Sequence, residues 1–337
     1  MRLSLLGLLI AAAAAWGFLA LVFAVQLDGA LRNGLVAAFV LVSVVTLVAL
    51  FFRSWRLSAL TVFILVFGMV LHQYLALEPS NGRDWQLEAA VLPYATVEGD
   101  LVKVHNIRNF DYRSESDFTP AYYDKSFDLR TLEGVDFIAV YWMGPAIAHT
   151  FLSFAFAGGD HLAISIETRK EKQEGYSTLK GFFRQYEIYY VVADERDVIR
   201  LRTNYRRDPP EDVYVYRVQG RPENGRRVFM EYVKQVNSLV SSPRFYNTLS
   251  SNCTIDIWDN ALVNDGHLPF SWKILASGYL PEYLYEAGRL DTSVEFEELR
   301  RRAHVNMRAQ AAGSAPDFSR LIRQEDGPRP ISSSPAR

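Results

Sequence analysis

Three long apolar segments, separated by short stretches with charged residues, make up the first 77 residues. No charged side chain occurs between Arg2 and Asp28, and two further uncharged segments cover residues 33–52 and 57–77. A helix needs roughly 20 apolar residues to cross a hydrocarbon core of about 30 Å. Each segment has that length and is rich in Leu, Val, Ala and Phe, so we predict transmembrane helices over about residues 4–26, 33–52 and 57–77.

An alternative for the first segment is a cleaved signal peptide, because Arg2 precedes an alanine-rich apolar run. This run is long for the core of a signal peptide, and two further apolar segments follow it. Retention of the segment as a membrane helix is therefore the favoured prediction.

The short loops between these segments predict the orientation of the chain. Arg2, Arg53 and Arg56 would lie on one side of the membrane, and the positive-inside rule places that side in the cytoplasm. Three crossings then put all residues after Leu77 on the opposite side. We expect a multi-pass protein of the bacterial inner membrane with a cytoplasmic N-terminus and a periplasmic C-terminal domain.

The pattern changes to that of a soluble domain at residue 78. Residues 78–100 are predicted to form a linker, because they include the turn-forming run Pro79-Ser80-Asn81-Gly82. Short β-like runs and two helical patterns follow within residues 101–300, so we expect one α+β domain with an antiparallel sheet. Residues 301–337 are rich in Ala, Ser, Pro and Arg, and their composition predicts a disordered tail.

Composition and charge exclude several classes of function. The chain has 36 basic and 38 acidic side chains, a net charge of −2, so it has no general positive field that would attract nucleic acid. A single cysteine allows neither an internal disulfide nor a cysteine-clustered zinc site. The sequence also has no Gly-rich phosphate loop and no His-x-x-x-His pair. We therefore expect no metal, no cofactor and no nucleic-acid partner.

Cys253 is the first candidate for chemistry. It follows Asn252, a residue type that caps helices, and it precedes a run with helical spacing, so it is predicted to lie in the first turn. Unpaired backbone N–H groups and the helix dipole favour the thiolate at that position. The alternative is a buried cysteine that acts as a small hydrophobe. The polar neighbours of Cys253 and its predicted oxidising compartment favour the reactive thiol.

A nucleophilic cysteine requires a base, and His149 is the best candidate for that role. It begins a predicted strand in which alternation places His149, Phe151 and Ser153 on one face. The opposite face of this strand is apolar core, so His149 is expected to face the more open side. Four other histidines of the outer domain are weaker candidates, because they lie at turns, in charged surroundings or without an evident partner: His105, His161, His267 and His304.

The next strand provides a possible third residue. Gly158-Gly159-Asp160 turns the chain into a strand on which Ser165, Glu167 and Arg169 share one face. In a tight hairpin, Glu167 and Arg169 would lie beside His149, and Glu167 could orient the imidazole. A solvated hairpin face with an ordinary Glu–Arg pair is an equally good interpretation of this spacing.

Several separated motifs resemble one known family. They are Asn106-Ile107-Arg108-Asn109-Phe110, His149-Thr150-Phe151-Leu152-Ser153-Phe154, Ser165-Ile166-Glu167-Thr168-Arg169 with Glu171, and Tyr246-Asn247-Thr248-Leu249-Ser250-Ser251-Asn252-Cys253-Thr254. In this order they resemble the Lnb N-terminal periplasmic domain family over about residues 101–288. The order of histidine strand and Asn-Cys helix is also similar to circularly permuted papain-like proteins.

This resemblance implies acyl transfer at a periplasmic membrane face, because the family includes a bacterial lipoprotein N-acyltransferase. It implies Cys253 as nucleophile, His149 as base and Glu167 as the residue that holds the imidazole. Supporting or substrate-binding roles fall to Ser153, Ser165, Arg169, Asn252 and Thr254. One departure is that three membrane helices precede the domain here, whereas they follow it in the acyltransferase.

Three functions remain open from the sequence. The favoured one is a membrane-anchored acyltransferase that carries an acyl chain on Cys253, with a phospholipid or lipoprotein as substrate and an amine as acceptor. The same pair of residues could instead hydrolyse an amide, such as a cell-wall peptide. The third hypothesis is a non-catalytic, membrane-tethered binding module.

Overall fold

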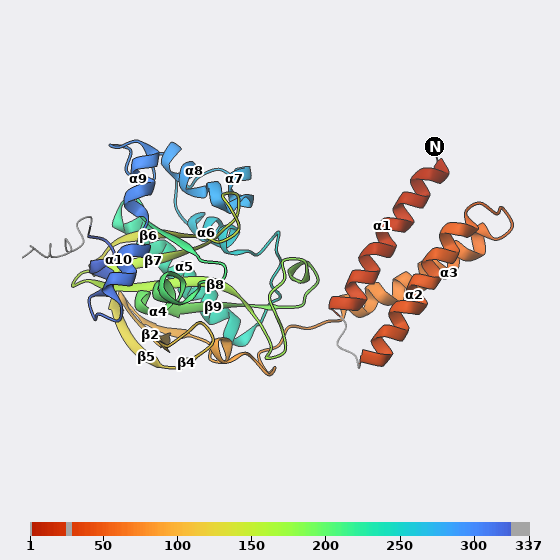
Figure 1. Ribbon diagram of the computed structural model, residues 1–337, viewed down its shortest axis with the longest axis horizontal. Helices are drawn as coiled ribbons and strands as arrows, with labels where there is room; N and C mark the ends of the chain where they lie inside the picture. The colour runs from red at the N-terminus through yellow and green to blue at the C-terminus, as the bar shows by residue number, and fades with distance from the viewer. Residues whose placement is uncertain (1, 25–28, 325–337) are drawn as a thin grey trace, which may run out of the picture. The chain divides into compact units, whose positions relative to one another are not determined.

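The computed structural model describes residues 2–24 and 29–324 (Figure 1). The chain divides into two compact units. The helical unit comprises Met1–Arg83 with two later segments, Gln173–Glu187 and Arg244–Thr248. The mixed unit comprises the remaining residues from Asp84 onward.

Three long helices form the helical unit: α1 (Arg2–Phe23), α2 (Gly29–Ala49) and α3 (Arg56–Leu75). Each is long and apolar enough to cross a membrane. Large apolar side chains such as Leu8, Leu41 and Leu65 are exposed along them, which suits a lipid environment rather than water. The three apolar helices predicted from the sequence are confirmed, and residues 25–26 of the first prediction lie outside the described residues.

Small and hydroxyl residues allow the helices to pack closely. A Cβ atom on Gly17 of α1 would lie 2.5 Å from the ring of Phe39 on α2, so only glycine accommodates that ring. Ser43 and Thr46 donate to the carbonyl oxygens of Phe39 and Val42 at 2.8 Å each, which satisfies both hydroxyls within α2. Such small-residue contacts are typical of helix packing in membranes.

The segment 173–187 packs against the helices of its own unit. Phe183 is buried, and its ring lies 6.4 Å from that of Trp16. The guanidinium of Arg184 donates to the carbonyl oxygen of Tyr74 at 3.1 Å and stacks on the Tyr74 ring. Arg184 therefore caps the C-terminus of α3, where a cation is favourable.

The mixed unit contains an eight-stranded sheet in the order β1-β2-β9-β8-β7-β6-β10, with β5 also paired to β2. The strands are β1 (Tyr94–Glu98), β2 (Leu101–Arg108), β5 (Tyr122–Asp128), β6 (Leu132–Tyr141), β7 (Ala148–Phe156), β8 (Asp160–Arg169), β9 (Glu187–Ala193) and β10 (Asp212–Arg217). A small separate sheet pairs β3 (Asp111–Tyr112) with β4 (Phe118–Thr119). Among the described strand registers only β2–β9 is parallel, so the predicted α+β class with a mainly antiparallel sheet is confirmed.

Helices cover both faces of this sheet (Figure 1). The helices that pack on the sheet around the site are α4 (Glu195–Arg200), α5 (Pro222–Ser241), α6 (Cys253–Ala261), α10 (Asn306–Ala312) and α11 (Phe318–Leu321). The shorter elements are η1 (Leu87–Ala89), η2 (Leu129–Thr131), η3 (Lys180–Phe182), η4 (Leu201–Tyr205), α7 (Trp272–Leu275), η5 (Ser277–Tyr279), α8 (Leu280–Glu286) and α9 (Phe296–Ala303). Phe154 and Phe156 pack on Phe229 of α5, whereas Phe151 packs in a cluster with α4, α10 and α11.

The expectation that His149 lies on an open face of its strand is wrong. Phe151 and Ser153, which share that face, are fully buried. The reason is that the C-terminal helices cover the face, and the alternation pattern of one strand carries no information about distant helices. When both faces of a strand are buried, alternation of polar and apolar residues no longer tells which face is exposed.

The predicted disordered tail is folded as far as residue 324. Val305, Ala309 and Phe318 are buried in the core, and Ala312 packs against the same cluster. The tail has few apolar residues, but positions 305, 309 and 312 recur at helical spacing and form one apolar stripe. Residues 325–337 of the prediction lie outside the described residues.

The predicted linker at residues 78–100 is also largely part of the fold. The mixed unit begins at Asp84, and η1 and β1 both lie within the range of the predicted linker. The short alternating pattern of β1 was too brief to be recognised beside the turn residues that precede it.

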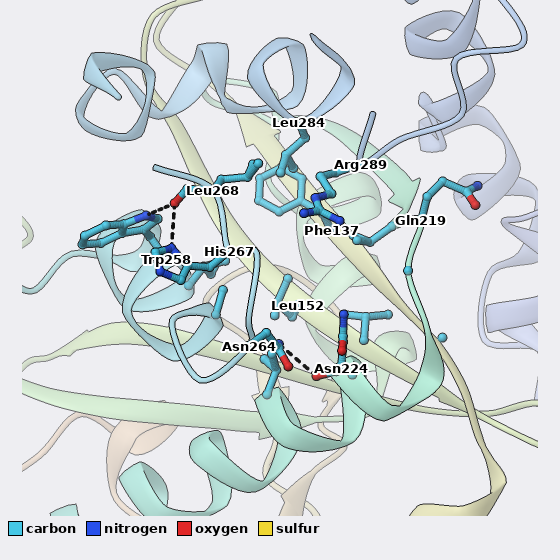
Figure 2. A pocket seen from close by; sticks show the side chains of 18 of the residues that line it. Phe137, Leu152, Gln219, Asn224, Trp258, Asn264, His267, Leu268, Leu284 and Arg289 are labelled. Carbon is cyan, nitrogen blue, oxygen red and sulfur yellow. Dashed lines mark hydrogen bonds between the residues drawn. The ribbon is translucent and has the colours of Figure 1, made fainter. Parts of the chain in front are cut away.

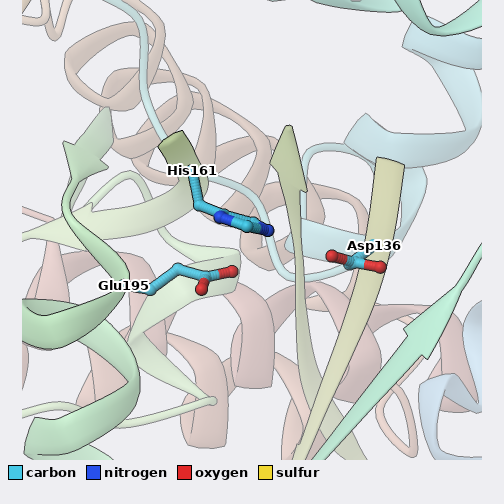
Figure 3. A group of neighbouring side chains, drawn as sticks. All are labelled: Asp136, His161 and Glu195. Atoms are coloured by element: carbon cyan, nitrogen blue, oxygen red, sulfur yellow. The ribbon is translucent and has the colours of Figure 1, made fainter. Parts of the chain in front are cut away.

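Arg323 attaches the C-terminal segment to two buried acids. Figure 3 shows Asp136 and Glu195 pointing toward one another beside His161. One side-chain nitrogen or oxygen atom of each of the three residues lies within 4.8 Å of the other two. Arg323 donates to Asp136 Oδ2 at 2.7 Å and to Glu195 Oε2 at 2.8 Å. Burial alone would raise the pKa of Glu195, but the charge and hydrogen bonds of Arg323 lower it to about 2. The guanidinium thus provides the positive charge that both carboxylates require.

We expect Arg323→Met to destabilise the mixed unit by about 3–5 kcal/mol, because it leaves two buried carboxylates without their shared cation. Thermal unfolding of the purified chain measures this loss. Arg320→Met is the matched control, since Arg320 pairs with Asp317 at the surface and should contribute less than about 1 kcal/mol. Equal losses in the two variants would contradict the anchoring role of Arg323.

Candidate active site

Cys253 is the first residue of α6, as the sequence predicts. Asn252 is the N-cap, and its Oδ1 accepts the backbone N–H groups of Thr254 at 3.0 Å and Ile255 at 2.9 Å. The thiol therefore lies at the positive end of the helix dipole, and its side chain is partly exposed. This position favours the thiolate.

Buried hydrogen bonds hold α6 against the sheet. Thr254 Oγ1 lies 3.0 Å from Thr150 Oγ1 on β7, and both side chains are fully buried. One turn along the helix, Asp256 accepts a hydrogen bond of 2.6 Å from the Tyr190 hydroxyl on β9. These two contacts fix the N-terminus of α6 beside the start of β7, where His149 lies.

His149 lies beside Ser165 and Glu167 on the neighbouring strand. Strands β7 and β8 pair as far as Leu152 with Ile164. Beyond these pairs the side chains of His149 and Glu167 still meet, as the hairpin register predicts. Nε2 of His149 is 2.8 Å from Ser165 Oγ and 3.1 Å from Glu167 Oε1. The Ser165 hydroxyl in turn donates to Glu167 at 3.1 Å. The imidazole is therefore oriented by a serine and a carboxylate together.

His149 and Cys253 lie close enough for each to shift the pKa of the other. Because Nε2 faces Ser165 and Glu167, Nδ1 is the nitrogen that remains for the thiol. Burial would lower the pKa of His149, but the charge of Glu167 and the contact with Cys253 raise it to about 9. Burial would raise the pKa of Cys253, but His149 and hydrogen bonds from Thr150 lower it overall. These opposite shifts both favour the imidazolium–thiolate pair over the neutral pair.

Arg202 is a residue of this site that sequence analysis missed. Its Nη2 donates to Glu167 Oε1 at 3.0 Å, and its side chain is only 5% exposed. Burial would raise the pKa of Glu167, but His149, Arg202 and Arg206 hold it well below its usual value. Arg202 belongs to η4, a single π-helical turn, and such turns often occur at functional sites. The Arg-rich run around it has the pattern of a solvated surface, so the sequence offers no clear signal.

Two predicted supporting residues lie elsewhere. Arg169 does not lie beside His149, because its Nε donates to the Ala89 carbonyl at 2.9 Å and its guanidinium stacks on Trp85. Ser153 is buried beside Glu195, whose pKa it helps to lower. Strand twist and the covering helices separate these side chains from His149, although all lie on the predicted face.

The other predicted residues fall into two groups. Ser165, Asn252 and Thr254 lie around the Cys253–His149 pair, as described above. The remaining histidines of the mixed unit have other neighbours: His105 pairs with Asp124, His161 with the Gly159 carbonyl, His267 with the Leu268 carbonyl and His304 with Asp212. Among the described histidines of this unit, His149 alone contacts Cys253.

A cavity of about 410 Å³ lies along the other side of α6 (Figure 2). Its interior is bounded by the sheet, by α5 and α6, and by the short helix α8. The lining side chains from the sheet and α5 include Leu132, Val135, Phe137, Leu152 and Val228, and those from α6 are Thr254, Ile257, Trp258 and Ala261. Thr254, the residue after Cys253, lines the cavity, whereas Cys253 itself does not.

Comparison with known proteins gives one match. Residues 118–278 match the family model described as Lnb N-terminal periplasmic domain. This segment contains the Cys253–His149 pair, Glu167 and Arg202. Neither a curated protein nor a solved structure matches the chain.

The first prediction for this site concerns the reactivity of Cys253. His149→Ala removes the hydrogen bond and the charge that lower the pKa of the thiol, so alkylation by iodoacetamide at pH 7 should slow by about tenfold. The rate is measured by intact-protein mass spectrometry, which is simple because the chain has one cysteine. His105→Ala is the control, and an equal rate in all three proteins would contradict the ion pair.

The second prediction concerns the pH dependence of the same reaction. Glu167→Gln keeps the shape of the side chain but removes the charge that raises the pKa of His149 to about 9. The pKa of the imidazole should therefore fall below that value. A neutral imidazole stabilises the thiolate less, so the alkylation profile should move to higher pH. Asp124→Asn, which neutralises the partner of His105, should leave the profile in place. A shift to lower pH in Glu167→Gln would contradict this electrostatic order.

Proposed function

Because residues 118–278 belong to the Lnb N-terminal periplasmic domain family, we propose that this chain is a membrane-anchored periplasmic cysteine acyltransferase. Three candidate membrane helices accompany that domain, so the chain is a membrane-associated protein with a domain of periplasmic type. The positions of Arg2, Arg53 and Arg56 support the inner membrane with a cytoplasmic N-terminus. The resemblance to lipoprotein N-acyltransferase supports acyl transfer as the chemistry.

The Cys253–His149–Glu167 arrangement is the observation that carries this proposal. In the first step the Cys253 thiolate attacks the ester carbonyl of a phospholipid or lipoprotein acyl chain. A C–S bond forms as the ester C–O bond breaks, and the imidazolium of His149 donates its proton to the leaving alkoxide. The products of this step are a thioester on Cys253, a neutral His149 and a lipid alcohol.

The second step returns the site to its starting state. A primary amine, such as a lipoprotein N-terminus, attacks the thioester carbonyl while neutral His149 accepts one of its protons. The C–N bond forms, the C–S bond breaks, and the thiolate faces an imidazolium again. Glu167 stays ionised in both steps and stabilises the charged imidazole.

The helix N-terminus also provides a donor for the oxyanion. Asn252 Oδ1 accepts hydrogen bonds from the N–H groups of Thr254 and Ile255. Among the described residues, none accepts a hydrogen bond from the N–H group of Cys253. That group lies at the start of a helix, where the dipole favours negative charge. It is therefore suited to stabilise the tetrahedral intermediate next to the nucleophile.

The test is intact-protein mass spectrometry of the detergent-purified chain after incubation with phospholipid. We expect a fatty-acyl adduct on the wild type that hydroxylamine removes, because hydroxylamine cleaves thioesters. The adduct should be absent from Cys253→Ser and strongly reduced in His149→Ala, which lacks the acid for the leaving alkoxide. Addition of an amine acceptor should then discharge the adduct.

The other outcomes would support the competing functions. No adduct in the presence of a readily alkylated Cys253 would contradict acyl transfer and favour a papain-like peptidase or amidase. No adduct together with an inert Cys253 would favour a non-catalytic binding module.

A further inference from the structure

We propose that the cavity along α6 binds the alkyl chain of the acyl group that Cys253 carries. This inference rests on the proposed function for the identity of the alkyl chain. Where that alkyl chain binds is a separate question, which the cavity answers. It assigns Ile257, Trp258 and Ala261 of α6, together with Leu284 of α8, to the walls of an acyl-binding site (Figure 2).

The size and lining of the cavity suit a hydrocarbon chain. Its volume of about 410 Å³ falls in the range of about 300–1,000 Å³ that is typical of ligand sites. Protein interiors are otherwise packed with few voids larger than a water molecule. The apolar lining includes side chains of Leu, Val, Ile and Phe from the sheet, α5, α6 and α8. An apolar space of this size is completed by an apolar occupant rather than by water.

Several polar groups in the wall are already hydrogen-bonded within the protein, which disfavours a polar ligand at those positions. The Trp258 indole donates to the Leu268 carbonyl at 2.9 Å, and Thr254 is bonded to Thr150. Asn264 accepts from Arg227 at 2.7 Å and donates to the Asn224 carbonyl at 3.2 Å. A peptide or sugar would need free donors and acceptors at this depth, because unpaired buried polar groups are costly.

Charge at the rim does not select an ionic head group. The charged residues that line the cavity are Glu133, Arg217, Arg221, Asp265 and Arg289. Arg217 is paired with Asp136 at 2.6 Å, and the other four comprise two acids and two bases. The cavity therefore recognises its occupant by the chain and not by a charge.

The position of the cavity connects it to the nucleophile. Residues 254, 257, 258 and 261 lie on one face of α6, so the cavity runs along about 10 Å of helix from its first turn. The Sγ atom of Cys253 is 3.8 Å from the hydroxyl of Thr254, which lines the near end. Cys253 itself does not line the cavity, so an acyl chain on its Sγ atom would pass Thr254 to reach the apolar interior.

Photo-crosslinking of a fatty acid with a terminal diazirine tests this site without any chemistry at Cys253. The probe is incubated with full-length Cys253→Ser protein in detergent, irradiated, and mapped by peptide mass spectrometry. We expect adducts on peptides that contain residues 254–261 and 280–284, in competition with unlabelled fatty acid. In the same background Ala261→Phe fills the cavity and should lower this labelling by at least about tenfold.

Two further variants make the result decisive. Leu262→Phe adds a similar ring to the exposed C-cap residue of the same helix and should leave the labelling unchanged. Leu284→Trp fills the cavity from α8 and should reduce labelling even if Ala261→Phe does not fold, which its thermal unfolding reveals. Labelling confined to residues 2–75, or labelling that persists in both filled variants, would overturn the proposal.

The two proposals can fail independently. Labelling of the cavity without a thioester on the wild type would contradict the acyltransferase and leave the alkyl site standing. A thioester that forms equally well in Ala261→Phe and Leu284→Trp would contradict the alkyl site and leave the acyltransferase standing.

Discussion

The carboxylate of Glu167 accepts three contacts at one oxygen atom, and the chemistry of Cys253 depends on them. Oε1 lies 3.1 Å from His149 Nε2, 3.1 Å from Ser165 Oγ and 3.0 Å from Arg202 Nη2. The two cationic partners keep the carboxylate ionised despite its burial. Its charge raises the pKa of His149, and the charged imidazole lowers the pKa of the thiol. Without this charge the imidazolium and the thiolate would both be less favoured.

The C-terminal helices support this charge from the face of the sheet on which His149 lies. Arg202 lies in the π-helical turn η4, and Gln310 of α10 donates to the Thr203 carbonyl of that turn at 2.9 Å. Arg323 anchors the end of the same segment to Asp136 and Glu195. Residues 301–324, which have few apolar side chains, thus help to hold the guanidinium of Arg202 against Glu167. Buried charged groups of this kind require complete sets of partners, which explains the many arginines in the region.

The site was predictable wherever its geometry follows from local rules. Asn252 caps α6 because an Asn side chain satisfies the free N–H groups of a first turn. Glu167 lies beside His149 because a hairpin with a short turn fixes its own register. Arg169 obeys the same alternation but contacts Ala89 and Trp85 instead, since its long side chain follows the elements that pack over it. Strand register therefore predicts the face of the sheet on which a side chain lies, but not the residues that the side chain contacts.

The sequence by itself determined the three apolar helices, the α+β class, the capped cysteine and the opposition of His149 and Glu167. Each of these depends on periodicity or on contacts between residues close in the chain. Only the tertiary structure decided that Arg202 meets Glu167, that residues 301–324 fold, and that a cavity follows α6. These features join residues far apart in sequence, such as Asp136 and Arg323. No short pattern records such a contact, because it exists only when the sheet and its covering helices have packed together.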